Sequence, residues 1–122
     1  MALKDVVDVA GQVTTGGSRL FDGTEAPQDA ACVANLRAAG AVLIGKANLH
    51  ELTAGSHDNP WFGKVVNPRD PARGTGGTSS GSAAAVAAGF CALALGSDTG
   101  GSNRSVAANT GLFGFKPSQG LV

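Results

Sequence analysis

Cysteine is scarce in this chain of 122 residues, which contains only Cys32 and Cys91. Two thiols are too few to staple a small fold, so a disulfide-rich secreted domain is excluded and reduced, buried side chains are the better interpretation. An excess of either charge is also lacking, because nine Lys and Arg residues offset nine Asp and Glu residues. Nothing in this balance favours nucleic acid or a membrane surface as a partner.

The opening sequence, MALKDVVDVAG, is neither a signal peptide nor a membrane span. Together with the reduced thiols, this predicts a soluble, cytoplasmic protein that does not associate with a membrane.

Several familiar catalytic motifs are missing. There is no HExxH sequence and no cysteine cluster, so His50 and His57 are interpreted as surface or capping residues, and no metal or cofactor is expected. The sequence GTSSG around Ser79 matches a nucleophile elbow, but the histidine that must follow it in that fold is lacking. The glycine-rich loop 74–82 lacks the GK[ST] ending of a nucleotide-binding loop, which leaves anion binding by its backbone N–H groups as an alternative.

Glycine, by contrast, is abundant, with 19 residues. Two turns combine glycines with hydroxyl residues: GTGGTSSGS at 74–82 and GSDTGGSNR at 96–104. The first leads into SAAAVAAG, which predicts a closely packed helix ending at Gly89, and the second follows an apolar run at 90–95 that predicts a buried strand. Such turns place hydroxyl and free N–H groups at the mouth of a packed core, as acyl-transfer chemistry requires.

The remaining elements predict an α/β fold. Apolar residues recur at helical spacing behind Pro27 and stop at Gly40, so a helix is expected within 22–40. The apolar run at 41–45 predicts a buried strand directly after this helix, and the loosely alternating residues 3–9 predict another. We therefore expect a single compact domain over residues 1–122, with a mixed or mostly parallel sheet flanked by helices.

With histidine-based triads excluded, a hydroxyl nucleophile needs another base, and lysine is the candidate. Four motifs stand in order along the chain: LIGKANLHEL at 43–52, GGTSSGSAAAVAAG at 76–89, ALGSDTGGSNR at 94–104 and GLFGFKP at 111–117. Together they resemble the amidase signature family, and the opening LKDVVDVAG and the later TTGGS are similar to that family's first segment. The resemblance covers nearly the whole chain.

The resemblance implies an amidase that cleaves the C–N bond of a small-molecule carboxylic amide, and of esters or anilides by the same route, through an acyl-enzyme intermediate. Carried over by position, it makes Lys46 the base, Thr78 the bridging hydroxyl residue and Ser102 the nucleophile, with Ser79 as an alternative relay. From its position directly after the expected strand, Lys46 is either a solvated strand terminus or a partly buried amine whose pKa is lowered by desolvation; the role of base requires the second.

The turn at 96–104 has two further roles under this resemblance. Its backbone N–H groups would form an oxyanion hole, and two glycines allow the tight turn that this needs; the residues are Thr99, Gly100, Gly101 and Ser102. Asp98 and Arg104 are interpreted as supports that hold the nucleophile loop by hydrogen bonds or ion pairing. A direct role for this pair in substrate binding is the alternative.

The chain departs from the family pattern in places. Thr78 stands where the family has a serine held by a cis peptide, Asn103 where an apolar residue is common, and Val106 where a proline is common. Family members are also considerably longer, so the chain resembles a short version or a core of that fold whose sheet edge a second copy could cover. We expect a minimal hydrolase with an open site; the alternative is a non-catalytic core or an anion-binding module.

Overall fold

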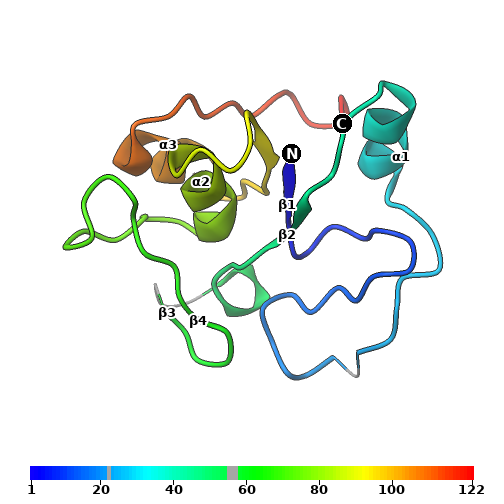
Figure 1. Ribbon diagram of the computed structural model, residues 1–122, viewed down its shortest axis with the longest axis horizontal. Coiled ribbons are helices and arrows are strands. Elements are labelled where there is room, and N and C mark those ends of the chain that lie inside the picture. Colours follow the sequence, from blue (N-terminus) through cyan, green and yellow to red (C-terminus); the bar gives the residue numbers. More distant parts are fainter. Residues whose placement is uncertain (22, 55–57) are drawn as a thin grey trace.

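The computed structural model describes residues 1–21, 23–54 and 58–122. Within them, β1 (Ala2–Lys4), β2 (Gly45–Ala47) and β5 (Ala94–Leu95) form a parallel sheet in the order β2-β1-β5. Figure 1 shows the helices α2 (Ser80–Ala87) and α3 (Arg104–Thr110) on one side of these strands and α1 (Ala31–Ala38) on the other. The predicted α/β class, with a parallel sheet flanked by helices, is confirmed.

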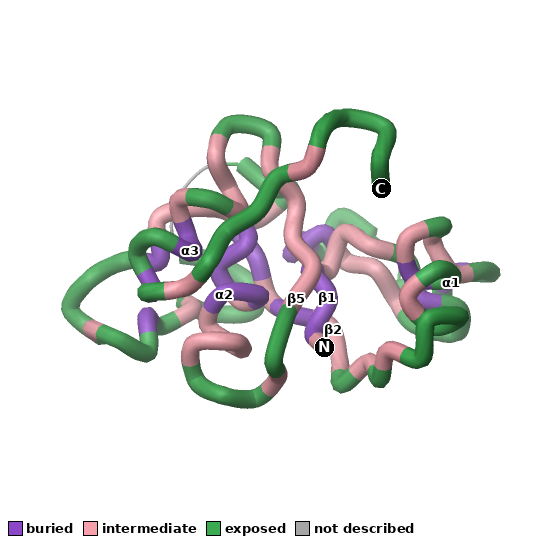
Figure 2. Tube along the Cα trace, turned by 90° about the horizontal axis from the view of Figure 1, so that it is seen from above, coloured by how far each residue is buried: buried purple, intermediate pink, exposed green. Residues whose placement is uncertain are grey.

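The central strand β1 has two different faces because successive side chains of a strand point in opposite directions. Leu3 packs with Val9 and with Val33 of α1, and all three side chains are buried. Lys4 belongs to the other face of the strand, the one in contact with α2. Figure 2 shows that buried residues are concentrated on β1 and α2, whereas much of α1 is exposed.

The helix α2 packs closely because it consists almost entirely of serine, alanine and glycine. Its Gly81 N–H donates a hydrogen bond of 3.0 Å to the carbonyl of Asn48, just beyond β2. A Cβ atom at position 81 would lie 2.7 Å from the Asn48 nitrogen, so only glycine fits without movement. The start of α2 is thereby fixed against the sheet.

The element boundaries differ from those predicted. The expected buried strand at 41–45 is wrong: β2 begins at Gly45, and Val42 and Ile44 are 74% and 54% exposed. The expected strand at 90–95 is reduced to β5, and the helix expected within 22–40 is reduced to α1. Ala30 precedes α1 in an extended conformation, and Gly40 follows it with φ +84°, so the backbone itself ends the helix.

A short antiparallel strand pair and a 3₁₀ turn lie among the loops that follow β2. The strands β3 (Asp58–Asn59) and β4 (Gly63–Lys64) form an antiparallel pair, and η1 (Glu51–Thr53) is a short 3₁₀ turn. The buried Asn59 side chain donates hydrogen bonds to the carbonyls of Gly17 and Leu49, at 2.7 and 2.9 Å, and so ties two loops together. None of the helices in the described ranges is long and apolar enough to cross a membrane.

Candidate active site

Lys4 is a lysine with no exposed surface, at the end of the central strand. Its Nζ lies 2.6 Å from Thr78 Oγ1, 2.8 Å from Ser97 Oγ and 3.2 Å from Ser79 Oγ. Buried charges are normally paired with an opposite charge, whereas this nitrogen is in contact with three hydroxyl groups. Burial without a carboxylate in direct contact disfavours the ammonium form.

The pKa of Lys4 reflects that burial. Desolvation lowers it from 10.5 to about 8, while the negative charge of Asp98 acts in the opposite direction. About a tenth of the molecules would then hold a neutral amine at pH 7, against fewer than about one in a thousand for an exposed lysine. A neutral amine is a base, so the position of Lys4 supplies what general-base chemistry needs.

Thr78 connects Lys4 to Ser102. The Thr78 and Ser102 hydroxyl oxygens are 2.9 Å apart, and the Thr78 backbone N–H also donates a hydrogen bond of 3.2 Å to Ser102 Oγ. Both residues are half-buried, so Ser102 lies at the border between the packed core and solvent. The result is a continuous line of short contacts from an amine, through one alcohol, to a second alcohol.

Ser79 has a different geometry from Thr78. Its hydroxyl donates to the Ser97 carbonyl at 3.0 Å and accepts from the Ser97 N–H at 3.2 Å, so it fixes the backbone of the second turn. Its oxygen also contacts Lys4, but within the described residues the hydroxyl that bonds to Ser102 is that of Thr78. Ser79 therefore stands beside the line from Lys4 to Ser102 and does not lie on it.

The turn before α3 is held by Asp98. Its carboxylate accepts hydrogen bonds from the N–H groups of Gly101 and Asn103 and from the Arg104 guanidinium, and this last bond is the main reason that its pKa lies well below the ordinary value. Because the Gly101 N–H points at Asp98, it is not a free donor for an oxyanion hole. The N–H groups of Thr99, Gly100 and Ser102 donate to no acceptor among the described residues, and Thr99 and Gly100 are exposed.

Lys46, the base expected from the sequence, lies elsewhere. Its Nζ is 2.8 Å from Asp5 Oδ1 and donates to Thr14 Oγ1 at 3.0 Å. The reason is strand register: Lys46 is paired with Leu3, and side chains paired in this way share the face opposite to Lys4. The assignment of the base to Lys46 is corrected here, because this residue is engaged in an ion pair away from both hydroxyls.

The backbone around Thr78 answers a question that the sequence leaves open, namely whether the cis peptide of the family pattern is kept. Every peptide bond in the described ranges is trans, including the one between Gly77 and Thr78. A Cβ atom at position 77 would lie 2.9 Å from Ser105 Oγ and from Val106 Cγ1, so this glycine allows the loop to approach α3. Close approach of the two turns is what brings Thr78 to Ser102.

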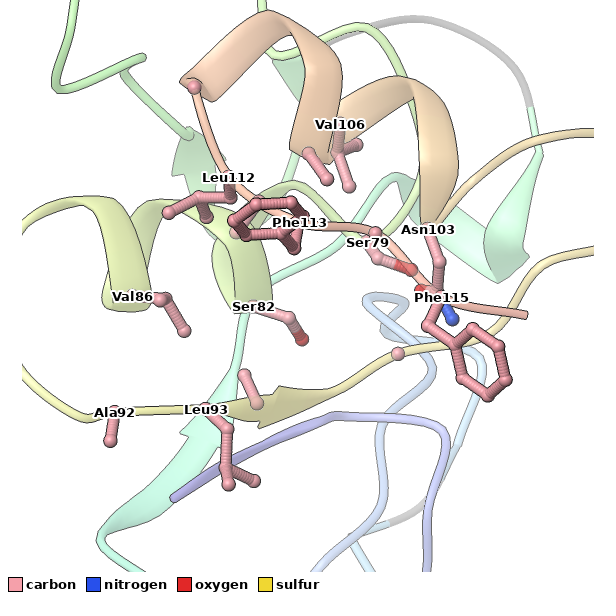
Figure 3. Close-up of a pocket in the computed structure, with 16 residues that line it drawn as sticks. Ser79, Ser82, Val86, Ala92, Leu93, Asn103, Val106, Leu112, Phe113 and Phe115 are labelled. Atoms are coloured by element: carbon pink, nitrogen blue, oxygen red, sulfur yellow. The ribbon is translucent and has the colours of Figure 1, made fainter. Parts of the chain in front are cut away.

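A cavity of about 330 Å³ opens next to the site, between α2, α3, β5 and the segment 111–115. Figure 3 shows apolar side chains around it, among them Val86, Leu112 and Phe113, with Ser79 and Asn103 at one end. Lys4, Thr78 and Ser102 are not among the lining residues. The cavity therefore adjoins the group of hydroxyls through Ser79 but does not contain the nucleophile.

No group of three or more His, Cys, Asp or Glu side chains that could bind a metal occurs in the part of the chain that the structure describes. His57, one of the two histidines considered from the sequence, lies outside those residues. The residues gathered here, an amine and four hydroxyls, are not a typical ligand set for a metal.

Sequence reasoning missed two residues of this site. Lys4 stands in the motif LKDVVDVAG, but it lies within a strand, and the pattern of the residues does not tell which face it occupies. Ser97 stands in a turn so rich in hydroxyls that nothing distinguishes it from its neighbours. The signal that could have found Lys4 is a charged residue inside a strand that is otherwise apolar and central, where a solvated lysine has no place.

The similarity to known proteins is high over this short length. A glutamyl-tRNA(Gln) amidotransferase subunit from Symbiobacterium thermophilum is 53% identical over 123 residues, which include all of this chain and 25% of that protein. The crystal structure of the corresponding subunit from Thermotoga maritima matches with a TM-score of 0.89 and 46% identity, over 95% of this chain and 26% of that one. A peptide amidase solved with the inhibitor chymostatin matches with a TM-score of 0.80 and 38% identity, over 88% and 23%.

The chain thus spans about a quarter of the length of the relatives it matches. The Amidase family model matches residues 1–122, and the chain belongs to the Amidase family.

Proposed function

We propose that this chain carries the reaction centre of an amide-cleaving enzyme with Ser102 as nucleophile, Thr78 as relay and Lys4 as base. The observation that carries the proposal is the unbroken line Lys4 Nζ, Thr78 Oγ1, Ser102 Oγ, with separations of 2.6 and 2.9 Å. Family membership and the pKa of Lys4, lowered to about 8, support it. Ser79, the alternative relay, is a weaker candidate because its hydrogen is engaged with a carbonyl.

The first half of the reaction forms an acyl-enzyme. Ser102 Oγ attacks the carbonyl carbon of the amide as its proton passes to Thr78 Oγ1, and the proton of Thr78 passes to the Lys4 amine. The carbonyl oxygen becomes an oxyanion, for which the N–H groups of the exposed residues Thr99 and Gly100, and that of Ser102, are available donors. The C–N bond then breaks, and the proton returns through Thr78 to the leaving amine.

The second half repeats these steps with water as nucleophile. Water loses a proton to the same relay, adds to the acyl carbon and releases the carboxylic acid, while Ser102 recovers its proton. The transfers within the protein occur between groups already in hydrogen-bond contact, which is the geometry that proton relays need.

A second candidate comes from the relatives that are called amidotransferase subunits. In an amidotransferase the amine released from one amide is transferred to an acceptor molecule instead of leaving into solution, and the term subunit implies a partner protein. The same three residues would cleave the amide in both cases. Free ammonia from simple amides favours the hydrolase; cleavage that requires a partner and an acceptor favours the amidotransferase.

The cytoplasmic location expected from the sequence stays a prediction.

The test is amide hydrolysis and active-site labelling of the purified protein. We expect turnover of simple aliphatic or aromatic amides, and a single adduct with a serine-reactive fluorophosphonate at Ser102. Ser102→Ala should remove both. Unchanged turnover or labelling in Ser102→Ala, or an adduct at Ser79, would refute the assignment of the nucleophile.

A further inference from the structure

The hydrogen bonds of Ser79 fix how it can interact with Lys4. A serine hydroxyl has one hydrogen to donate and two lone pairs that accept. The hydrogen of Ser79 goes to the Ser97 carbonyl at 3.0 Å, and one lone pair accepts from the Ser97 N–H at 3.2 Å. Only a lone pair remains for Lys4, so Ser79 can accept from the amine but has no proton to give it.

For the neutral amine of Lys4, it then remains to decide which hydroxyl donates to its lone pair. It carries two hydrogens and one lone pair, and its three neighbours are Thr78, Ser79 and Ser97. One hydrogen is taken by Ser79. Either Thr78 donates to the lone pair while Ser97 accepts the second hydrogen, or the two exchange roles, and only the first arrangement allows Lys4 to receive a proton from Thr78.

The surroundings of Ser97 favour the first arrangement. Ser79 bonds to both the N–H and the C=O of Ser97, so the backbone of Ser97 is fixed beside Lys4, and the Ser97 hydroxyl lies 2.8 Å from the Lys4 amine. Ser97 and Thr78 are both half-buried. Within the described residues the Ser97 hydroxyl is bonded to Lys4 alone, so its own hydrogen can turn to water and leave a lone pair for the amine, whereas the Thr78 hydroxyl is also bonded to Ser102. Lys4 has no exposed surface, so its amine cannot turn to bulk water in the same way.

We propose that Ser97 is a positioning residue whose hydroxyl accepts a hydrogen bond from Lys4 and, together with Ser79, directs the lone pair of the amine at Thr78. The inference rests on the proposed function and adds to it the residue that selects the direction of the proton relay. Within the described residues no hydrogen bond joins Ser97 to Ser102, so Ser97 acts through Lys4.

The nearby charges are themselves paired. Asp98, which follows Ser97, is bound by Arg104 of α3, and Asp5, which follows Lys4, is bound by Lys46 of β2. A substitution at Ser97 leaves both ion pairs in place. A shift in the pH dependence of such a variant therefore reports on the hydrogen bonds of Lys4.

The experiment measures the rate at which a fluorophosphonate labels Ser102, as a function of pH, in the wild type and in Ser97→Ala, Ser97→Cys and Ser97→Thr. In Ser97→Ala we expect the plateau rate at high pH to fall about 10- to 100-fold, because the amine can turn away from Thr78. The midpoint should move to lower pH, because the ammonium form loses a charge-assisted hydrogen bond. Ser97→Thr keeps the hydroxyl and should stay within about threefold of the wild type.

Two results would overturn the inference. One is a plateau unchanged in Ser97→Ala; the other is a fall in rate with the midpoint moved to higher pH, which is what loosened packing and entry of water around Lys4 produce. If Ser97→Ala does not fold, Ser97→Cys decides, because a thiol of similar shape is a weak acceptor: a rate equal to the wild type refutes the proposal, and a fall of about tenfold supports it. Ser102→Ala distinguishes failure of the proposed role of Ser97 from failure of the proposed function. Labelling that persists in Ser102→Ala refutes the proposed function itself.

Discussion

At the scale of single residues, the burial of Lys4 decides the chemistry. The side chain has no exposed surface and its amine contacts three hydroxyl oxygens, so its charge is poorly compensated and its pKa falls to about 8. Lys46 has different partners, because its Nζ lies 2.8 Å from Asp5 Oδ1 and donates a hydrogen bond to Thr14 Oγ1. The two lysines lie on adjacent strands, yet of the two it is Lys4 whose amine is in hydrogen-bond contact with Thr78.

This contrast gives the first prediction. Lys4→Met should lower kcat for amide cleavage by about 10²- to 10⁴-fold, the usual contribution of a general base. Lys46→Met, the matched control, should cost stability because Asp5 loses its partner, while kcat of the folded protein changes less than about tenfold. Steady-state kinetics with thermal unfolding of both variants provides the measurement. A larger loss of kcat in Lys46→Met than in Lys4→Met would reverse the assignment.

Thr78 supports a second prediction at the same scale. Thr78→Val keeps the shape and removes the hydroxyl, so kcat should fall by about 10²- to 10⁴-fold with little change in KM. Thr78→Ser keeps the hydroxyl and should retain activity within about tenfold. Comparable activity in Thr78→Val and the wild type would show that the proton reaches Lys4 by another path.

Much of the site could be predicted at this scale, and the exception has a physical reason. Both hydroxyl-rich turns were identified from their residues, and the structure brings Thr78 and Ser102 to 2.9 Å. The choice between Lys4 and Lys46 depends on register and on which face of a three-residue strand each residue occupies. Register is a property of the paired strands, so no local pattern in either segment contains it.

At the scale of elements, the position of α2 depends on close contact with the backbone beyond β2. Two effects compete at Gly81: alanine is a better helix former by about 1 kcal/mol, but its Cβ would overlap the Asn48 backbone. The second effect should win because neither backbone can move without shifting the turn that carries Thr78. Packing, and not helix propensity, therefore fixes this residue as glycine.

The corresponding prediction is that Gly81→Ala lowers the free energy of unfolding by about 1 to 3 kcal/mol, as overpacked sites do. Gly74→Ala is the matched control, since the nearest atom to a Cβ there would be 4.0 Å away and its φ is not in the left-handed region; it should change stability by less than about 0.5 kcal/mol. Chemical denaturation of both variants measures the difference. A stabilised Gly81→Ala would mean that helix propensity dominates.

The sequence predicts the type of these elements, helix or strand, but not their length. The helix ending before Gly89 and the helix ending before Gly40 are both present, because glycine with positive φ ends a helix at the level of local backbone. The strands are shorter than the apolar runs that predicted them. An apolar run such as 41–45 shows only that burial would be favourable, and here Val42 and Ile44 remain exposed.

At the scale of the whole molecule, large apolar side chains remain uncovered. Phe113 and Phe115 are 108% and 79% exposed, next to the cavity between α2, α3 and β5. Exposed apolar surface of this kind favours association. We expect sedimentation velocity to show concentration-dependent self-association, weakened about tenfold or more when both phenylalanines are replaced by serine. Association that is equally strong in the double variant would place the contact on another surface.

The buried amine also couples folding to pH. Lys4 has a pKa of about 8 in the folded chain and an ordinary value of 10.5 when exposed, so between these values the unfolded chain binds more protons than the folded one. The free energy of unfolding should therefore rise with pH from about 8 to about 10.5, and below about pH 8 the full cost of burying the ammonium is present. The shift corresponds to at most about 3 kcal/mol, and partial hydration of the amine should reduce this to about 1 to 2 kcal/mol.

Lys4→Met isolates this contribution from that of the other titrating groups. The unfolding free energy of the wild type, measured relative to that of Lys4→Met by urea denaturation from about pH 7 to about pH 10.5, should increase as the pH rises. In Lys46→Met, the matched control, Lys4 stays in place, so the unfolding free energy of this variant relative to that of the double variant Lys4→Met, Lys46→Met should show the same rise. A difference between Lys4→Met and the wild type that is independent of pH would mean that Lys4 keeps an ordinary pKa, and a base that is protonated at neutral pH could not accept the proton of Thr78.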